Sequence, residues 1–164
     1  MSIEENKTIV RRYIEELNRR NVSVIDEVIA ENLTVQILHH SPPSMAEWVG
    51  REAMRQGYLR NITTYPDYRV TIEEMLAEDD RVVLYWTHRG THQGEFDPRG
   101  APGSGIAPTG KVITGAAVTF YRIVGGKIAE MRALWDRADT WQQFGLIPDE
   151  DEILQTRKGQ VVTS

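Results

Sequence analysis

The stretch HRGTHQGEF, residues 88–96, places two histidines and a carboxylate close together along the chain. His88 and His92 are four residues apart, and Glu95 follows them. In a strand, residues four apart lie roughly 13 Å from each other, at about 3.3 Å per residue. A zinc ion needs its donors at about 2 Å. Whether this stretch belongs to a metal enzyme, an acid–base enzyme or neither therefore depends on its secondary structure.

The residues around this stretch alternate as in a β-hairpin. Alternation runs over 68–78 and over 81–96, and Asp79-Asp80 between them predicts a turn. His88 and His92 would then lie at the end of a strand, which disfavours a shared metal ion. They remain candidates for acid–base catalysis or for orienting a ligand, unless they are only histidines at the surface end of a hairpin.

A second hairpin follows a loop rich in glycine and proline. Residues 97–110 form that loop, and residues 111–124 and 127–136 are the two strands, with Gly125-Gly126 as their turn. Residues 137–148 predict a short closing helix.

The first part of the chain predicts helices. Ser2 and Glu5 have the spacing of a capping box, and the apolar residues that follow recur every three or four positions. Further elements are a short helix over 21–32, a short strand over 33–40 and a third helix over 50–63.

This order, helices first and then long antiparallel strands, predicts an α+β fold. We expect a curved antiparallel sheet with the N-terminal helices packed over its concave face, enclosing an apolar cavity. Residues 1–150 are expected to form a single domain, and residues 151–164 a polar C-terminal tail that frays.

Composition narrows the classes of partner. The chain has 164 residues, a formal net charge of −5 and no cysteine. An acidic chain is not expected to bind nucleic acid or an anionic membrane surface. The polar N-terminus lacks the apolar core of a signal peptide, so we expect a cytoplasmic protein.

Alternation also predicts which strand residues face the cavity. Val82, Leu84, Trp86 and His88 share the bulkier and more apolar face of their strand. On the next two strands, the residues sharing a face are Thr119 with Tyr121, and Met131 with Ala133 and Trp135. Such a wall would suit a planar aromatic ligand held by stacking, although each of these residues could equally be an ordinary core residue.

His39 and His40 end the short first strand. Successive strand residues point to opposite sides, so one of the two is expected to face the cavity. Histidine is the side chain best suited to proton transfer near pH 7, and His39 is therefore a catalytic candidate beside the structural alternative.

The ordered set GREAMRQGY, GTHQGEF, GIAPTGK, FYRIVGGKIAEMRALWD and QQFGLIP closely resembles the SnoaL-like polyketide cyclase and ester cyclase family, which has the nuclear transport factor 2-like fold. The resemblance covers roughly residues 5 to 148. It implies an antiparallel sheet curled around a hydrophobic cavity, capped by the N-terminal helices, and usually a dimer.

The chain departs from this family at two positions. The aldol cyclases of the family use an Asp on the last strand and a His on the strand before it, and these positions correspond to Ala133 and Thr119. Neither side chain can carry a proton at neutral pH. Asp136 falls where many relatives carry an Asp at the end of the strand, although an Asp before a short helix is often an N-cap.

The sequence leaves three functions open. The first is a cofactor-free cyclase or isomerase of an aromatic polyketide or a similar carbonyl compound, in which Asp136, His39, His88 or His92 carries the proton and Tyr121 or Trp86 donates to an oxyanion. The second is a hydratase, dehydratase or epoxide-opening enzyme on the same fold. The third is a non-catalytic protein that binds a small molecule.

We expect no cofactor and no metal. The expected partners are a small hydrophobic or aromatic ligand and a second copy of the chain, because apolar residues such as Val83 and Tyr85 on the outer face of the sheet need cover.

Overall fold

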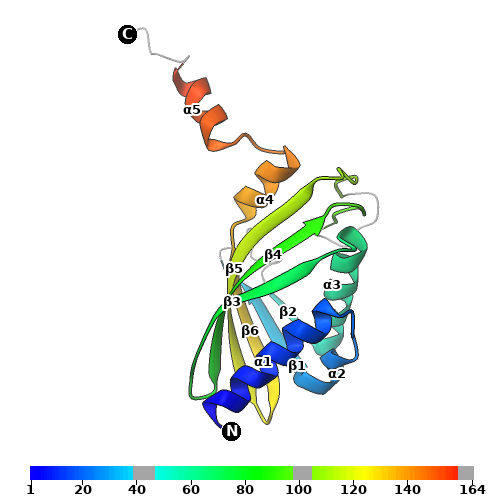
Figure 1. Ribbon diagram of the computed structural model, residues 1–164, viewed down its shortest axis with the longest axis vertical. Helices are drawn as coiled ribbons and strands as arrows, with labels where there is room; N and C mark the ends of the chain where they lie inside the picture. The colour runs from blue at the N-terminus through cyan, green and yellow to red at the C-terminus, as the bar shows by residue number, and fades with distance from the viewer. Residues whose placement is uncertain (39–46, 98–104, 159–164) are drawn as a thin grey trace.

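The computed structural model describes residues 1–38, 47–97 and 105–158. Figure 1 shows its helices and strands. The helices are α1 (Ile3–Asn18), α2 (Val24–Val28), α3 (Arg51–Thr64), α4 (Arg137–Phe144) and α5 (Glu150–Lys158). The strands are β1 (Ile29–Ile37), β2 (Glu47–Val49), β3 (Arg69–Glu78), β4 (Arg81–Thr91), β5 (Val112–Val124) and β6 (Lys127–Trp135).

Within these described residues the strands form one sheet, in the order β2-β1-β6-β5-β4-β3. The hairpins β3–β4 and β5–β6 are antiparallel, and the sheet curves with α1 and α3 on its inner side (Figure 1). The predicted α+β class is confirmed.

One pairing differs from the all-antiparallel sheet that we expected. β1 runs parallel to β6, with Val35 beside Met131. Alternation shows which face of a strand is buried. It does not show the direction of the neighbouring strand.

Both hairpin turns use the backbone conformations that their residues favour. Gly125 and Gly126 have φ values of 57° and 78°, as the two central residues of a type I′ turn require. Asp79 has a φ of 49°, which Asp tolerates better than most residues. The β5–β6 turn sets the register that places Thr119 opposite Ala133. Trp86 lies opposite Ala117 in the pairing of β4 with β5.

Two asparagines fasten α1 to the edge strand β3 and its turn. Asn18 accepts a hydrogen bond from the Val70 backbone N–H at 2.9 Å and donates one to the Val70 carbonyl at 2.8 Å. Near the other end of the helix, the buried Asn6 donates to the Asp79 carbonyl at 2.8 Å. α1 begins at the predicted capping box, in which Glu5 N–H donates to the Ser2 hydroxyl. These hydrogen bonds fix the distance between the helix and the sheet.

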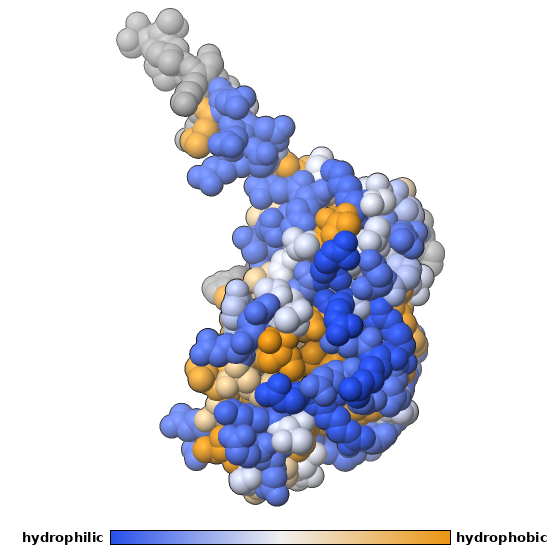
Figure 2. All heavy atoms as spheres, viewed as in Figure 1, coloured by the Kyte–Doolittle hydropathy of each residue, from blue (hydrophilic) through white to orange (hydrophobic). Residues whose placement is uncertain are grey.

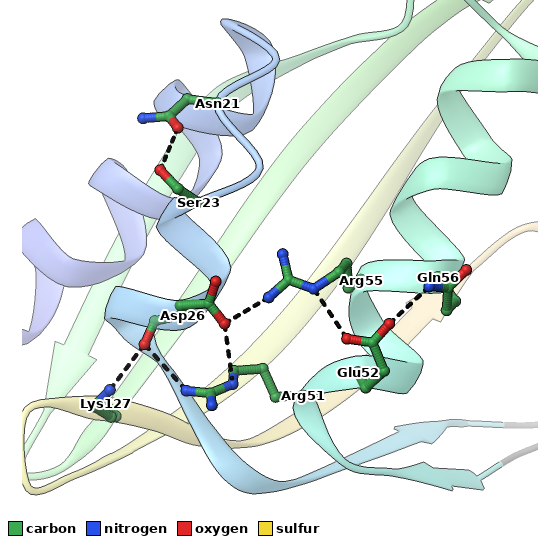
Figure 3. Close-up of polar contacts among 8 residues, drawn as sticks. All are labelled: Asn21, Ser23, Asp26, Arg51, Glu52, Arg55, Gln56 and Lys127. Carbon is green, nitrogen blue, oxygen red and sulfur yellow. Dashed lines mark hydrogen bonds and ion pairs between the residues drawn. The ribbon is translucent and has the colours of Figure 1, made fainter.

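A network of charged groups connects α2, α3 and the β5–β6 turn (Figure 3). The Asp26 carboxylate pairs with Arg55 at 2.5 Å and with Arg51 at 3.5 Å. Its backbone carbonyl accepts from Lys127 at 3.0 Å and from Arg51 at 3.1 Å. The network holds the start of α3 against α2.

The main core fills the space between the inner face of the sheet and the helices. Its fully buried members include Val10, Ile25, Leu33, Leu84 and Ile128. A second, smaller cluster of Tyr65, Ile113 and Phe144 lies under α4. Figure 2 shows one face of the molecule, on which hydrophilic residues predominate and apolar residues gather in a smaller area near the middle.

The C-terminal segment differs from the frayed tail that we expected. Residues 150–158 form helix α5, which projects from the body of the molecule in Figure 1. Asp149 caps it by accepting from Glu152 N–H at 2.8 Å, and three acidic residues occupy its first turn, where they stabilise the helix dipole. Within the described residues, no helix is long and apolar enough to cross a membrane.

We predict that Asn18→Ala lowers the free energy of unfolding by about 1–3 kcal/mol, because it leaves both backbone groups of Val70 without their partner. Chemical denaturation followed by circular dichroism measures this change. The matched control is Thr8→Ala on the exposed side of the same helix, where the change is expected to stay within about 0.5 kcal/mol. Equal losses in the two variants would contradict the role assigned to Asn18.

Candidate functional site

A cavity of about 900 Å³ lies between the inner face of the sheet and the helices α1, α3 and α4. Its volume is in the range of small-molecule sites. Six of the nine residues predicted to face the cavity line it, namely Trp86, Thr119, Tyr121, Met131, Ala133 and Trp135. Val82, Leu84 and His88, on the same face of their strand as Trp86, lie outside the lining. Strand alternation therefore located the wall of the cavity correctly. That these residues bind a substrate stays a prediction.

Three of these side chains form a chain of hydrogen bonds. The Trp86 indole Nε1–H donates to the Thr119 hydroxyl at 2.9 Å. The Thr119 side chain in turn hydrogen-bonds with Tyr121 and opposes the rise in its pKa, as a donor to the phenol oxygen does. An indole can only donate, so the Thr119 hydroxyl accepts from Trp86. When that hydroxyl donates its own proton to the Tyr121 oxygen, the Tyr121 O–H is left to donate to a ligand.

The phenols of the cavity stay protonated at neutral pH. Burial raises the pKa of Tyr121 well above its usual value, and it raises the pKa of Tyr68 and of Tyr13 in the same direction. The cavity therefore presents neutral phenol donors rather than phenolates.

His88 lies on the inner side of the sheet, next to the cavity wall. Its ring centroid is 5.7 Å from that of Trp86 and 5.5 Å from that of Tyr68, and both of those rings line the cavity. A side chain at Gly115 would meet the imidazole at 2.6 Å, so this glycine makes room for the ring. Burial lowers the pKa of His88 below 6.5, partly opposed by Asp139. The imidazole is therefore neutral at pH 7, and its buried Nδ1 has no hydrogen-bond partner among the residues that the structure describes.

His92, which the sequence suggested as a candidate for acid–base catalysis, does not face the cavity. It is completely buried, lies outside the cavity lining and packs against Phe144 at a ring distance of 4.8 Å. Its Nδ1 accepts from the Thr109 backbone N–H at 3.2 Å and lies 3.0 Å from the Thr109 hydroxyl. These contacts fix the segment before β5, which is a structural role.

Asp136 and Glu95 also lie outside the cavity lining. Asp136 is exposed and caps α4 by accepting from Asp139 N–H at 3.1 Å, as the structural alternative held. Glu95 accepts from Gly105 N–H at 2.9 Å. His39 lies outside the described residues. The side chains of His88, His92 and Glu95, all from the stretch 88–96, therefore do not form one site.

The sequence reasoning missed the helical side of the cavity. The lining there includes Tyr13, Arg20, Tyr58, Arg60 and Asn61, and Arg137 contributes from α4. The three- and four-residue spacing of α1 pointed to Tyr13. Arg20 follows the end of α1 in a left-handed conformation with a φ of 67°, and no local pattern indicates where its side chain lies.

No group of three or more His, Asp or Glu side chains in the described residues is arranged to hold a metal ion. The metal-free site stays a prediction.

We predict that the free energy of unfolding falls as the pH drops below about 6.5, and that His92→Gln makes this fall shallower. Burial lowers the pKa of His92 in the folded state. Below pH 6.5 the unfolded chain consequently binds more protons than the folded one, which favours unfolding. Urea denaturation at pH 7.5 and pH 5.5 measures the effect in both proteins. An unchanged pH dependence in the variant would contradict the buried, neutral state of His92, whatever stability the variant loses at both pH values.

Comparison with known proteins gives a family match over most of the chain. A sequence model described as "SnoaL-like polyketide cyclase" matches residues 7–144. No curated protein matches the chain.

Several solved structures share the fold. AclR from Streptomyces galilaeus, provisionally described as a hydroxylase, is 24% identical with a TM-score of 0.77, over 95% of each chain. A provisional SnoaL-like polyketide cyclase from Jannaschia sp. CCS1 is 20% identical with a TM-score of 0.74, over 90% of this chain and 97% of that one. IdmH from Streptomyces antibioticus, provisionally a polyketide cyclase, is 21% identical with a TM-score of 0.69, over 85% of this chain and 98% of that one.

At these identities the structures establish a common fold and no common substrate. The family match, which extends from α1 to the last residue of α4, goes further. The chain belongs to the SnoaL-like polyketide cyclase family.

Proposed function

We propose that the protein is a cofactor-free cyclase or isomerase that acts on a planar aromatic polyketide or a similar small carbonyl compound in the cavity. The observation that carries this proposal is the aromatic wall with the hydrogen-bond chain from Trp86 through Thr119 to Tyr121. Trp86 and Trp135 offer flat apolar surfaces for stacking. Tyr121 offers a proton donor at the same wall.

In this proposal, Tyr121 stabilises the oxyanion of an enolate. Removal of a proton next to a carbonyl group moves negative charge onto the carbonyl oxygen, and a preorganised donor in a site that excludes water stabilises that charge. Trp86, which we considered as an alternative donor, already donates to Thr119. Tyr121 is consequently the better candidate.

His88 is the proposed base. Its imidazole is neutral at pH 7 and can accept a proton. It lies behind the rings of Trp86 and Tyr68, so a small displacement of these rings has to open its path to the ligand. Asp136 and His92 lie away from the cavity and are no longer proposed as proton carriers.

A second candidate function is non-catalytic binding of the same class of ligand. It is favoured by the absence of any carboxylate or imidazole from the cavity lining within the described part of the chain. Such a protein would keep the aromatic wall and the donors and would lack proton transfer.

We predict that the protein accelerates exchange of the methyl protons of 2-acetylnaphthalene in D₂O, measured by proton NMR. This exchange requires an enolate and does not require knowledge of the natural product. Tyr121→Phe and His88→Gln should each lower the rate about a hundredfold, because one removes the oxyanion donor and the other the base. Asp136→Asn, which keeps an N-cap side chain, should leave the rate unchanged.

Two results would count against this assignment. Near-full exchange in both Tyr121→Phe and His88→Gln would show that other groups move the proton. Binding of the ketone without any acceleration would favour the non-catalytic function instead.

We also propose that the protein is a homodimer built on the outer face of the sheet. In the registers of β4, β5 and β6, Tyr85 lies beside Val118 and Val118 beside Leu134. Phe120 lies in the adjacent row, and Tyr85, Phe120 and Leu134 are each about two-fifths exposed. Together, Tyr85, Val118, Phe120 and Leu134 form an apolar strip that a second copy of the chain could cover. The cytoplasmic location stays a prediction.

We predict that light scattering at micromolar concentration gives the mass of a dimer, and that Leu134→Lys shifts the mass toward the monomer. A lysine in the middle of the strip would place an unpaired charge in the interface. The control is Ile3→Lys, at an exposed site on α1, which lies on the inner side of the sheet. A monomeric wild-type protein would contradict the proposal.

A further inference from the structure

We propose that the ligand of the cavity carries a carboxylate, which Arg20 and Arg60 bind while its planar body lies against the aromatic residues of the sheet. This inference rests on the proposed function in one respect, since both need a small aromatic molecule in the cavity. It adds the charge of the ligand and the residues that recognise that charge.

The charges of the cavity lining are all of one sign. Within the described residues, the lining contains Arg20, Arg60 and Arg137 and no aspartate, glutamate, histidine or lysine. The whole chain has a formal net charge of −5, so a purely cationic lining departs from the character of the molecule. In a cavity with apolar walls, charges of one sign focus the field and raise the local concentration of an oppositely charged ligand.

Arg20 has donor capacity that the protein leaves unused. Its Nη2 donates to the Pro66 carbonyl at 2.6 Å, which holds the side chain beside the link between α3 and β3. Its Nη1 is buried and has no hydrogen-bond partner among the described residues. Arg20 lines the cavity, and a rotation of its guanidinium group would bring Nη1 to a ligand.

Arg60 supplies a second cation from α3. It is exposed, lines the cavity and makes no ion pair with a described carboxylate. Its neighbour Arg55, one turn earlier on the same helix, faces Asp26 and Glu52 instead and pairs with both (Figure 3). The outward-facing arginine of α3 is thus neutralised by the protein, whereas the cavity-facing one is not.

A carboxylate fits these observations better than a neutral group does. The phenols of Tyr68 and Tyr121 are protonated and can also donate to a carboxylate oxygen. Guanidinium groups match carboxylates in charge and in planar geometry. A neutral ligand would leave both arginines in the cavity without a counter-charge.

The experiment compares anthraquinone-2-carboxylate with its methyl ester. The two share the planar ring system and differ in the charge at one end. Trp86, Trp135 and Trp141 line the cavity, so quenching of tryptophan fluorescence reports occupancy. At pH 7.5 and low salt, the acid should bind about tenfold more tightly than the ester or better, since hydrogen bonds to charged groups are the stronger ones.

The variants assign this preference to residues. Arg20→Gln and Arg60→Gln should each weaken binding of the acid severalfold and leave binding of the ester nearly unchanged. The matched control is Arg11→Gln, which removes the same charge from an exposed position of α1 outside the lining. It should preserve the preference for the acid. Thermal melts confirm folding, and the exposed Arg60 keeps the test decisive if Arg20→Gln is unstable.

Three outcomes would overturn the inference. Equal affinity of the wild-type protein for acid and ester would contradict recognition of a carboxylate and would leave the proposal of an aromatic ligand unaffected. A preference for the acid that survives both Arg20→Gln and Arg60→Gln would show that these residues do not supply it. Failure of both compounds to bind would contradict the proposal of an aromatic ligand, and with it the proposal that this ligand carries a carboxylate.

Discussion

The pair of hydrogen bonds between Asn18 and the backbone of Val70 is the constraint on which the cavity depends. β3 is an edge strand of the sheet, and Asn18 pairs with one N–H and one C=O on the side of β3 where no further strand can bind them. Asn6 binds the β3–β4 turn, so hydrogen bonds near both ends of α1 fix the distance between this helix and the sheet. The inner side chains of β4, β5 and β6 fill only part of the gap, and the remainder is the cavity.

This construction gives the cavity two unlike sides. The sheet contributes Trp86, Thr119 and Tyr121, and the Trp86 indole donates to the Thr119 hydroxyl. The helical side contributes Arg20 and Arg60, which have no carboxylate partner in the described part of the chain. Burial raises the pKa of Tyr13, Tyr68 and Tyr121 and favours their neutral form. Among the described lining residues, fixed charge comes from the arginines alone. A flat molecule with an acidic end would match both sides.

Sequence reasoning located one side of the cavity and not the other. Strand alternation has a period of two, so Met131, Ala133 and Trp135 could be assigned to one face without knowledge of their neighbours. Arg20 lies beyond the end of a helix, where no periodicity applies. His92 follows the last residue of β4, and the packing of α4 over it, which depends on residues about fifty positions later, decides its burial. The parallel pairing of β1 with β6 is likewise a long-range property.

The predicted departure from the aldol cyclases is consistent with Arg20 and Arg60, which make no ion pair with a described carboxylate. The family resemblance predicts that Thr119 and Ala133 occupy the positions of the aldol-cyclase His and Asp, and the two residues are direct partners in the β5–β6 register. Side chains in such positions have Cβ atoms about 5 Å apart. An Asp at position 133 would place negative charge on the wall that Trp86 and Tyr121 share, and it would repel an anionic ligand. With Ala133 there, the wall is uncharged, Thr119 is free to accept from Trp86, and a carboxylate held by Arg20 and Arg60 meets no opposing charge from the sheet.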